Sequence, residues 1–208
     1  MYPYSIQKLI DSFSKFPGIG PRTAARIAFY LLRQPVSEIN SLIEDISSVK
    51  KNLRQCKACL RFFNSQRKGD LCEICSNKSR KGDVLCVVEK ETDLASIEMN
   101  GFYKGLYFIL GRTISLMKKE DISALRLGEL QERIKNPYKL GLQKKVGEVI
   151  LALNPTVEGQ STVLFLERKL KDLNIKTTRL GCGLPRGGEV EYADKITLLS
   201  AFKNREEI

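Results

Sequence analysis

The chain of 208 residues contains no histidine. Histidine is the most common general base in enzymes, so its absence excludes Ser-His and Cys-His catalytic pairs. The sequence also lacks the G-x-x-x-x-G-K-[ST] loop that cradles nucleotide phosphates, which argues against direct ATP hydrolysis. The chain therefore carries little conventional catalytic machinery.

Long apolar runs are also missing, because no stretch approaches the roughly 20 residues that a membrane-spanning helix needs. Charged residues make up 28% of the chain, and its mean hydropathy is -0.22. Residues 1–11 show no basic flank followed by an apolar block and a small-residue cleavage site, which is the pattern of an export signal. We expect a soluble, cytoplasmic protein with no role in membranes.

The positive charge is concentrated in one segment. The whole chain has a net charge of +11, and residues 50–81 hold ten Lys and Arg against only Asp70 and Glu73, a local excess of +8. Such a segment suits a polyanion, because each phosphate that Lys or Arg neutralises releases condensed counterions. Charge alone equally fits a solvated face that keeps a small module soluble.

Four of the six cysteines form two C-x2-C pairs, Cys56 with Cys59 and Cys72 with Cys75, separated by twelve residues. Each pair directs two sulfur atoms toward one ion, and two pairs complete the tetrahedral thiolate site that zinc prefers. Two disulfides, a redox-active pair or an iron-sulfur cluster are the alternatives. We predict one structural zinc ion, Zn(2+), per chain, because four protein ligands leave no position open for water.

The N-terminal segment reads as two helices joined by a glycine turn. Apolar residues at helical spacing predict a helix over residues 5–16, and a second helix is predicted over residues 22–33. Gly18 and Gly20 in the turn let the backbone approach a ligand, and the start of the second helix suits a phosphate. Arg22, Arg26 and Arg33 share one face of that helix. A plain helical hairpin, with arginines covering a core edge, remains the alternative.

From Asp83 onward, short apolar runs alternate with helical patterns. This alternation predicts a mainly parallel sheet covered by helices on both faces, with Glu89 and Asn154 at its functional edge, where the strands end. Cys86 lies within an apolar run and is expected to be an inert buried thiol, and Cys182 is expected to be structural. The predicted strands cover residues 84–88, 106–110, 149–153 and 175–180, and the predicted helices cover 92–99, 158–173 and 192–202.

Five motifs in order resemble the RecR family of bacterial recombination mediators over essentially the whole chain. They are the glycine hairpin, the four cysteines, and the segments 87–93, 153–159 and 183–194. The resemblance implies a helix-hairpin-helix module over residues 1–53, a C4-type zinc finger over 54–81, a Toprim domain over 82–180 and a C-terminal helical segment over 181–208.

The resemblance also implies a function in DNA repair and recombination. A RecR-like protein acts with the partners RecO and RecF to load recombinase on single-stranded DNA at gaps, and it forms homodimers or homotetramers. The resemblance assigns sequence-tolerant DNA binding to the hairpin. It also makes the acidic residues at the Toprim edge, Glu89 and Glu158, candidates for contacts with a partner protein. The implied DNA-binding residues are Lys15, Gly18, Gly20, Arg22, Thr23 and Arg26.

Catalytic Toprim proteins hold magnesium with a glutamate after the first strand and an Asp-x-Asp pair after a later one. Glu89 matches the glutamate, but Asn154-Pro155-Thr156 stands where the pair belongs. We therefore predict no catalytic residue and no enzymatic activity, with Glu89 as a helix-capping carboxylate. One alternative is a nuclease or primase-like enzyme that uses Glu89 with Asp93 or Glu158, and another is a zinc-ribbon protein that binds RNA.

Overall fold

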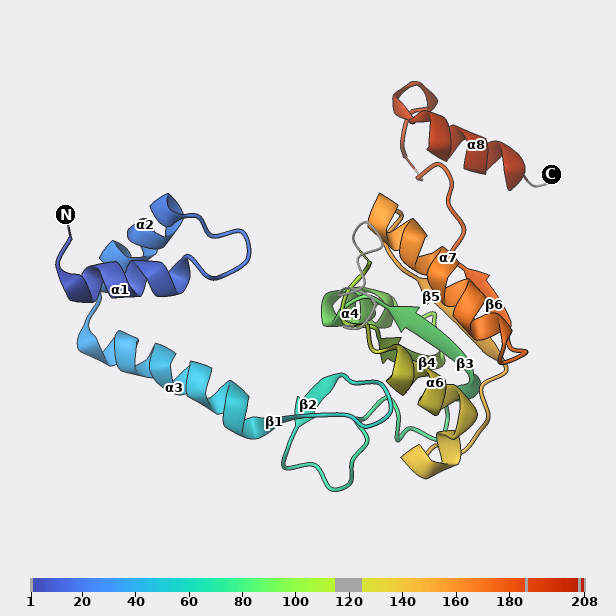
Figure 1. Cartoon of the computed structure of the whole chain (residues 1–208), viewed down its shortest axis with the longest axis horizontal. Helices are drawn as coiled ribbons and strands as arrows, with labels where there is room; N and C mark the ends of the chain where they lie inside the picture. The colour runs from blue at the N-terminus through green and yellow to red at the C-terminus, as the bar shows by residue number, and fades with distance from the viewer. Residues whose placement is uncertain (1, 115–124, 186, 206, 208) are drawn as a thin grey trace. The chain divides into compact units, whose positions relative to one another are not determined.

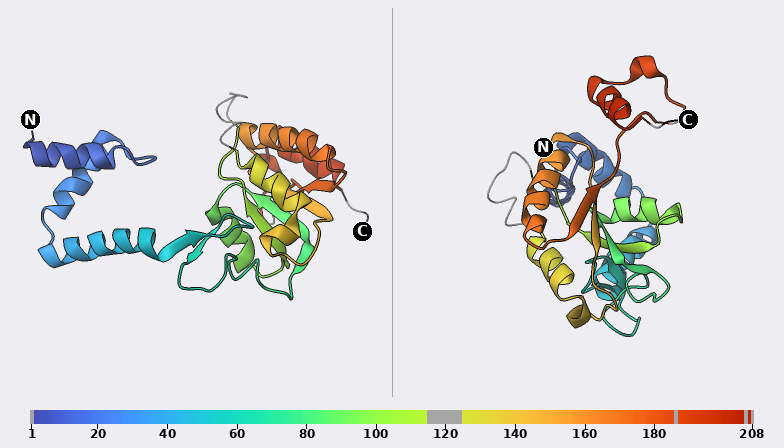
Figure 2. Two further views of the ribbon diagram at one scale, coloured as in Figure 1. Left: turned by 60° about the horizontal axis from the view of Figure 1, so that its bottom comes forward. Right: turned by 90° about the vertical axis from the view of Figure 1, so that its right-hand side faces the viewer.

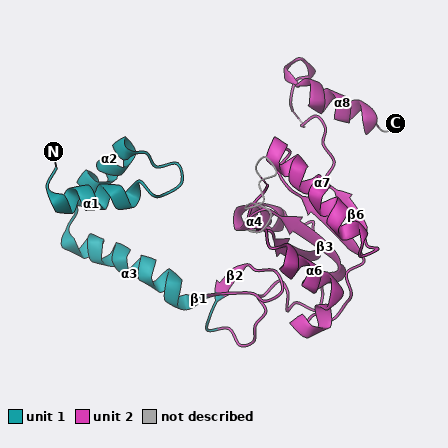
Figure 3. Ribbon diagram, viewed as in Figure 1, with its two compact units in different colours: residues 1–53, 64–66 teal, residues 54–63, 67–208 magenta. Residues whose placement is uncertain are grey.

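The computed structural model describes residues 2–114, 125–185, 187–205 and 207 (Figure 1). The chain divides into two compact units (Figure 3). The first comprises residues 1–53 and 64–66, and the second comprises residues 54–63 and 67–208. No helix in these described ranges combines the length and the apolarity that a membrane crossing requires.

The first unit is built on a helical hairpin of α1 (Tyr4–Phe13) and α2 (Pro21–Leu31). Ile10 of α1 packs against Ala24 and Ala28 of α2, and all three are buried. The small alanine side chains allow the two helices to approach closely. The predicted first helix was too long, because α1 ends at Phe13 and a turn places Phe16 largely in solvent. Pro17 explains why the helix does not reach Phe16, since the residue before a proline disfavours the helical conformation.

A third helix, α3 (Val36–Asn52), follows in the same unit, and the sequence analysis did not predict it. It begins after Pro35, which suits a helix start. None of its residues is buried within the described parts of the chain. Its exposed apolar side chains are Val36, Leu42, Ile43, Ile46 and Val49.

The second unit contains a four-stranded parallel sheet in the order β4-β3-β5-β6. The strands are β3 (Lys81–Val88), β4 (Gly105–Ile109), β5 (Glu148–Ala152) and β6 (Lys176–Arg179). Helices α6 (Leu127–Lys135) and α7 (Val157–Lys171) lie on one face of the sheet, and α4 (Glu91–Met99) lies on the other (Figure 2). The predicted parallel α/β architecture is confirmed. Burial on both faces explains why the strands read as continuous apolar runs.

Two parts of this unit differ from the sequence prediction. The connection from β4 to β5 includes α6 and the 3-10 helix η1 (Pro137–Leu140), neither of which was predicted. The helix predicted over residues 192–202 is broken into η2 (Val190–Tyr192) and α8 (Lys195–Lys203). The break falls at Asp194, whose carboxylate accepts hydrogen bonds from the Ile196 and Thr197 amides at 2.8 and 3.0 Å and so caps α8. Arg186, within the predicted 183–194 motif, lies outside the described residues.

Candidate metal centre and nucleic-acid interface

The four cysteines of the two C-x2-C pairs converge on one point. All four are buried, and their sulfur atoms lie within 4.8 Å of one another. Cys59 Sγ and Cys72 Sγ are 3.5 Å apart, far longer than the roughly 2.05 Å of a disulfide bond. A tetrahedron with metal–sulfur bonds of about 2.3 Å has edges of about 3.8 Å. The cluster therefore fits one metal ion.

Local turns and the neighbouring sheet position these sulfurs. The strands β1 (Leu53–Gln55) and β2 (Phe62–Asn64) pair on either side of the first cysteine turn. Within that turn, the Leu60 amide donates to the Cys56 carbonyl at 2.9 Å. The Cys59 carbonyl in turn accepts a hydrogen bond from the Ile109 amide of β4 at 3.0 Å. The cluster consequently shares one hydrophobic core with the α/β sheet.

The four thiols are strongly coupled to one another. Hydrogen bonds from Cys59, Cys72 and Cys75 hold the pKa of the Cys56 thiol far below its ordinary value. Hydrogen bonds with Cys56 first, and then with Cys59 and Cys72, raise the pKa of the Cys75 thiol well above its ordinary value. The Cys56 thiolate is thus stabilised by its neighbours, and metal binding must displace the protons of the thiols that are still protonated.

The acidic residues beside the cluster are already neutralised. Asp70 pairs with Lys57 at 2.6 Å and lies 3.6 Å from Arg54, and Glu73 pairs with Arg61. The module's other basic residues make no ion pair with any acid of its own segment in the described chain. In the described chain Arg80 pairs instead with Glu98 of α4, and the rest of this positive surplus has no acidic partner.

The predicted DNA-binding residues gather around the hairpin turn. Gly18 adopts a φ of +75°, which favours glycine, and no atom lies within 4 Å of a Cβ built on Gly18 or Gly20. The turn is therefore open to a ligand. Lys15 precedes it, and Arg22, Thr23 and Arg26 occupy the first turns of α2, all of them exposed. Within the described ranges, the three cations among these residues make no ion pair.

The sequence analysis missed the aromatic side chains beside these residues. Thr23, Arg26 and Arg33 line a groove of about 770 Å³ together with Tyr2, Phe29 and Tyr30. The ring of Tyr2 meets that of Phe29 edge-on, with centroids 5.2 Å apart. The spacing of Arg26 and Tyr30 in α2 could have revealed this shared face, because residues at i and i+4 lie together on a helix. Arg33 was predicted to lie in this helix, but it lies in the turn that follows the end of α2 at Leu31.

At the end of the sheet, Glu89 and Asn154 follow the adjacent parallel strands β3 and β5. Asn154 Nδ2 donates to Glu89 Oε2 at 3.1 Å. The helix-capping role expected of Glu89 belongs to Asp93 instead, whose carboxylate accepts from the Lys90 amide at 3.1 Å. Glu158 is exposed in the first turn of α7. Across the described residues, the four cysteines form the one group that could hold a metal through three or more such ligands.

A tight turn between β5 and α7 holds Asn154 in place. The Thr156 hydroxyl accepts from the Gly159 amide at 3.1 Å and caps α7. A Cβ on Gly159 would lie only 1.9 Å from the Asn154 carbonyl oxygen. The segment from Asn154 to Gly159 thus requires glycine at its end for the backbone to close.

Comparison with known families agrees with this architecture. Residues 6–50 match the model described as "RecR, helix-hairpin-helix", residues 83–181 match "Toprim domain", and residues 183–206 match "RecR, C-terminal". Fold and matches together define a modular Toprim protein with an N-terminal helix-hairpin-helix and a four-cysteine metal module.

Comparison with relatives over the full length of the chain identifies the family within this class. The recombination protein RecR of Bifidobacterium animalis subsp. lactis is 44% identical over 207 residues, covering 100% of this chain and 98% of the relative. RecR of Staphylococcus aureus strain Newman is 41% identical over 207 residues, covering 100% and 99%. RecR of Dehalococcoides mccartyi strain 195 is 41% identical over 202 residues, covering 97% and 94%. The chain belongs to the RecR family, as its motifs predicted.

Proposed function

We propose that this chain is a non-enzymatic, DNA-binding recombination mediator in DNA repair. In this proposal it acts with RecO and RecF to load recombinase on single-stranded DNA at gaps. The observation that carries the proposal is the open glycine turn at Gly18 and Gly20, bordered by cations that have no acidic partner in the described chain.

DNA binding at this turn is expected to tolerate any sequence. Backbone amides at the start of α2 and flexible cations contact phosphates, which carry no base information. The aromatic groove along α2 could add stacking with unpaired bases. The proposed DNA-binding residues are Lys15, Gly18, Gly20, Arg22, Thr23 and Arg26.

The metal in the cysteine cluster is proposed to be a single structural zinc ion. Four buried thiolates complete its coordination and leave no site for a reacting water. With its metal, the module folds a short segment that has few apolar residues of its own. We retain the four-part organisation as a proposal, with modules over residues 1–53, 54–81, 82–180 and 181–208.

The absence of enzymatic activity is supported by the sheet edge. Glu89 has a neutral amide beside it where a magnesium site would place carboxylates, and Asp93 is occupied in capping α4. Glu89 and Glu158 are proposed instead as contacts for a basic surface on RecO or RecF. Replacing both with alanine should weaken capture of the partner by this chain and leave DNA binding unchanged.

Self-association into a dimer or a tetramer is part of the proposal. The apolar side chains along α3 are exposed, as are Ile196, Leu199 and Phe202 of α8. Such faces are typical of surfaces that a second copy covers. We propose that the protein works in the cytoplasm and joins the nucleoid when it binds DNA.

The test is binding of a fluorescent single strand and duplex, in several unrelated sequences, across a salt series. Magnesium is included, and the products of the same samples are run on a gel. We expect salt-sensitive, sequence-tolerant binding with intact DNA, and loading of recombinase on coated single strands only when RecO is added. Magnesium-dependent nicking that disappears in Glu89→Ala would contradict the proposal and identify an atypical Toprim enzyme.

A further inference from the structure

The groove beside α2 lies wholly within the first unit. Its volume of about 770 Å³ falls inside the roughly 300–1,000 Å³ of known ligand sites. Thr23, Arg26 and Tyr30 line it from one face of α2, because they are three and four residues apart along the helix. Tyr2 lines it from the segment before α1, and Arg33 from the turn after α2. The chain before the first helix and the chain after the second therefore contribute to one groove.

Two tyrosine rings in this groove are open to a ligand. Tyr2 is 49% exposed, and Tyr30 is 62% exposed. The Phe29 ring is half-buried and meets the Tyr2 ring edge-on, with 5.2 Å between the centroids and an interplanar angle of 67°. An edge-on contact covers at most one face of either ring, so it supports Tyr2 without enclosing it. Both tyrosines therefore keep ring surface that can pack against another flat ring.

The groove is also cationic. Arg26 and Arg33 are exposed and make no ion pair with any described residue. None of the residues that line the groove in the described chain is acidic. The pattern extends beyond the groove, because residues 12–37 contain four Lys and Arg and no Asp or Glu. The ligand that fits this surface by charge is therefore an anion.

Open aromatic rings beside cations are typical of surfaces that bind single-stranded nucleic acid. Every base has a flat face that stacks on an aromatic ring, and the phosphates between the bases pair with arginine. A duplex fits such a surface less well, because its bases stack on one another and present only their edges in the grooves. An acidic peptide would pair with the arginines, but it offers the rings no series of flat groups.

We propose that this groove is a binding site for single-stranded nucleic acid, in which Tyr2 and Tyr30 stack on unpaired bases and Arg26 and Arg33 hold the adjoining phosphates. The inference rests on the proposed DNA-binding function and deepens it. The glycine turn contacts the phosphates of a duplex or of a single strand, whereas the groove favours the single strand. Tyr2, Tyr30 and Arg33 thus join the proposed DNA-binding residues.

The experiment uses the full-length, metal-loaded protein and the double variant Y2L/Y30L, which keeps apolar side chains in the groove but removes two aromatic rings. Its control is Y4L/Y138L, because Tyr4 and Tyr138 are exposed and do not line the groove. Affinity for a fluorescent oligothymidylate and for a duplex is measured across a salt series. Y2L/Y30L should bind the single strand at least about fivefold more weakly than the control does, which is the lower end of what stacking on one base contributes. Its duplex affinity and both salt slopes should match those of the control, because no charge is removed.

A strand without bases tests the stacking directly. The wild type is compared on oligothymidylate and on an abasic strand of the same length, which keeps the phosphates. The wild type should bind oligothymidylate at least about fivefold more tightly than the abasic strand, and Y2L/Y30L should bind the two strands equally. Equal binding of the two strands by the wild type would overturn the inference, and this comparison needs no substitution that could disturb the fold.

The arginine in the turn after α2 is tested separately. R33Q should lower the salt slope for the single strand by about 0.7, the value for one phosphate contact. Its control is K171Q, which removes one charge at an exposed position of the second unit. A slope for R33Q that equals that of K171Q would overturn the phosphate contact assigned to Arg33.

The remaining outcomes separate this inference from the proposed function. If the wild type binds DNA and Y2L/Y30L matches its control on both substrates, the inference is overturned and the proposed function stands. Equal losses on single strand and duplex would also overturn it, because the groove would then not select unpaired bases. A changed oligomeric state of Y2L/Y30L in sedimentation would identify the groove as a contact between copies instead. A wild type that binds no DNA at any salt concentration would overturn the proposed function and this inference with it. Metal content and thermal unfolding of each variant confirm that the fold is unchanged.

Discussion

Asn154 donates its side-chain amide to the carboxylate of Glu89 at 3.1 Å, across the ends of two adjacent parallel strands. The register that pairs Val88 with Ala152 brings these side chains together. A carboxylate at such a strand end usually meets a cation when it works in phosphoryl transfer. Here a neutral amide takes that place, and the pair becomes a structural tie between β3 and β5.

Asn154→Asp should convert this tie into a repulsive pair. Two carboxylates about 3 Å apart repel each other when both are ionised, so the variant should be less stable than the wild type at neutral pH and regain stability in acid, where protonation removes the repulsion. We expect magnesium to raise the melting temperature of Asn154→Asp but not that of the wild type or of Asn154→Ala. Equal stabilisation of all three proteins by magnesium would contradict the role given to Asn154.

Cys59→Ser should abolish stoichiometric metal binding and soluble expression. Structural zinc contributes about 10–16 kcal/mol to the folding of small modules, which exceeds the stability of a typical domain. Cys86→Ser is the matched control, because Cys86 is buried outside the cluster. Metal is measured by elemental analysis, and a soluble Cys59→Ser protein with one ion per chain would disprove the assignment. Lowering the pH should also release the metal, since protons compete for the thiolates.

Removing both Arg22 and Arg26 should weaken DNA binding equally for all sequences. R22Q/R26Q is expected to lower the duplex salt slope by about 2, one phosphate for each side chain. Both residues are exposed, so the melting temperature should stay unchanged. The control is K171Q/K195Q, which removes the same charge at exposed positions outside the hairpin, and binding by R22Q/R26Q that matches this control would exclude the hairpin as the DNA site.

Gly159→Ala should destabilise the second unit. Its Cβ would overlap the Asn154 carbonyl oxygen at 1.9 Å, which forces the start of α7 to move at a cost of about 1–3 kcal/mol or more. Gly128→Ala is the control, because Gly128 lies in α6 with no atom within 4 Å of the new Cβ. That variant should be as stable as the wild type or slightly more stable, because alanine favours the helix and Gly128 lies in its first turn. Urea unfolding compares the two, and a neutral Gly159→Ala would argue against the tight turn.

The two cysteines outside the cluster should differ in reactivity. Burial raises the pKa of Cys86 to about 12, whereas Cys182 is exposed. Iodoacetamide at a pH of about 8 should modify Cys182 in the metal-loaded protein and spare Cys86 until the protein unfolds, because only the thiolate reacts. Peptide mass spectrometry identifies the modified residue, and early labelling of Cys86 would contradict its burial.

Features set by local spacing were predicted from the sequence. The C-x2-C pairs identified the cysteine cluster, and the apolar runs identified the strands of the parallel sheet. Glu89 and Asn154 were both expected at its edge, because each follows a run. Their hydrogen bond was not predictable, since it depends on the register between β3 and β5.

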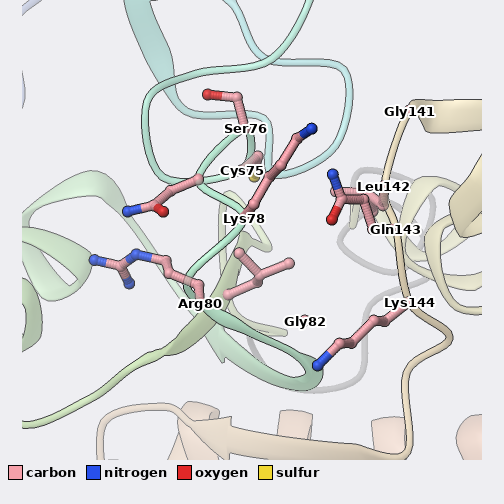
Figure 4. Close-up of a pocket in the computed structure, with 11 residues that line it drawn as sticks. Cys75, Ser76, Lys78, Arg80, Gly82, Gly141, Leu142, Gln143 and Lys144 are labelled. Carbon is pink, nitrogen blue, oxygen red and sulfur yellow. The ribbon is translucent and has the colours of Figure 1, made fainter.

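Other features had a local signal in the sequence but were not predicted correctly. The helix α3 repeats apolar residues at helical spacing, and this repeat is a local signal. None of these residues is buried in the described structure, so the repeat does not belong to a helix that packs on a core. Phe16 continues the apolar periodicity of α1 but lies outside the helix, because Pro17 disfavours the helical conformation in the residue before it. The contact of the segment after η1 with the metal module (Figure 4) had no local signal at all, because it arises only when the chain folds back on itself.

The hydrogen bond from the Ile109 amide to the Cys59 carbonyl joins the cysteine turn to the edge of the sheet. In the sheet order β4 is an edge strand, and its five residues are buried and mostly apolar. An exposed edge of this kind pairs readily with another chain and starts aggregation. We expect loss of the proposed zinc ion to release the cysteine turn from this edge, so that a protein deprived of zinc precipitates before its proposed affinity for DNA falls.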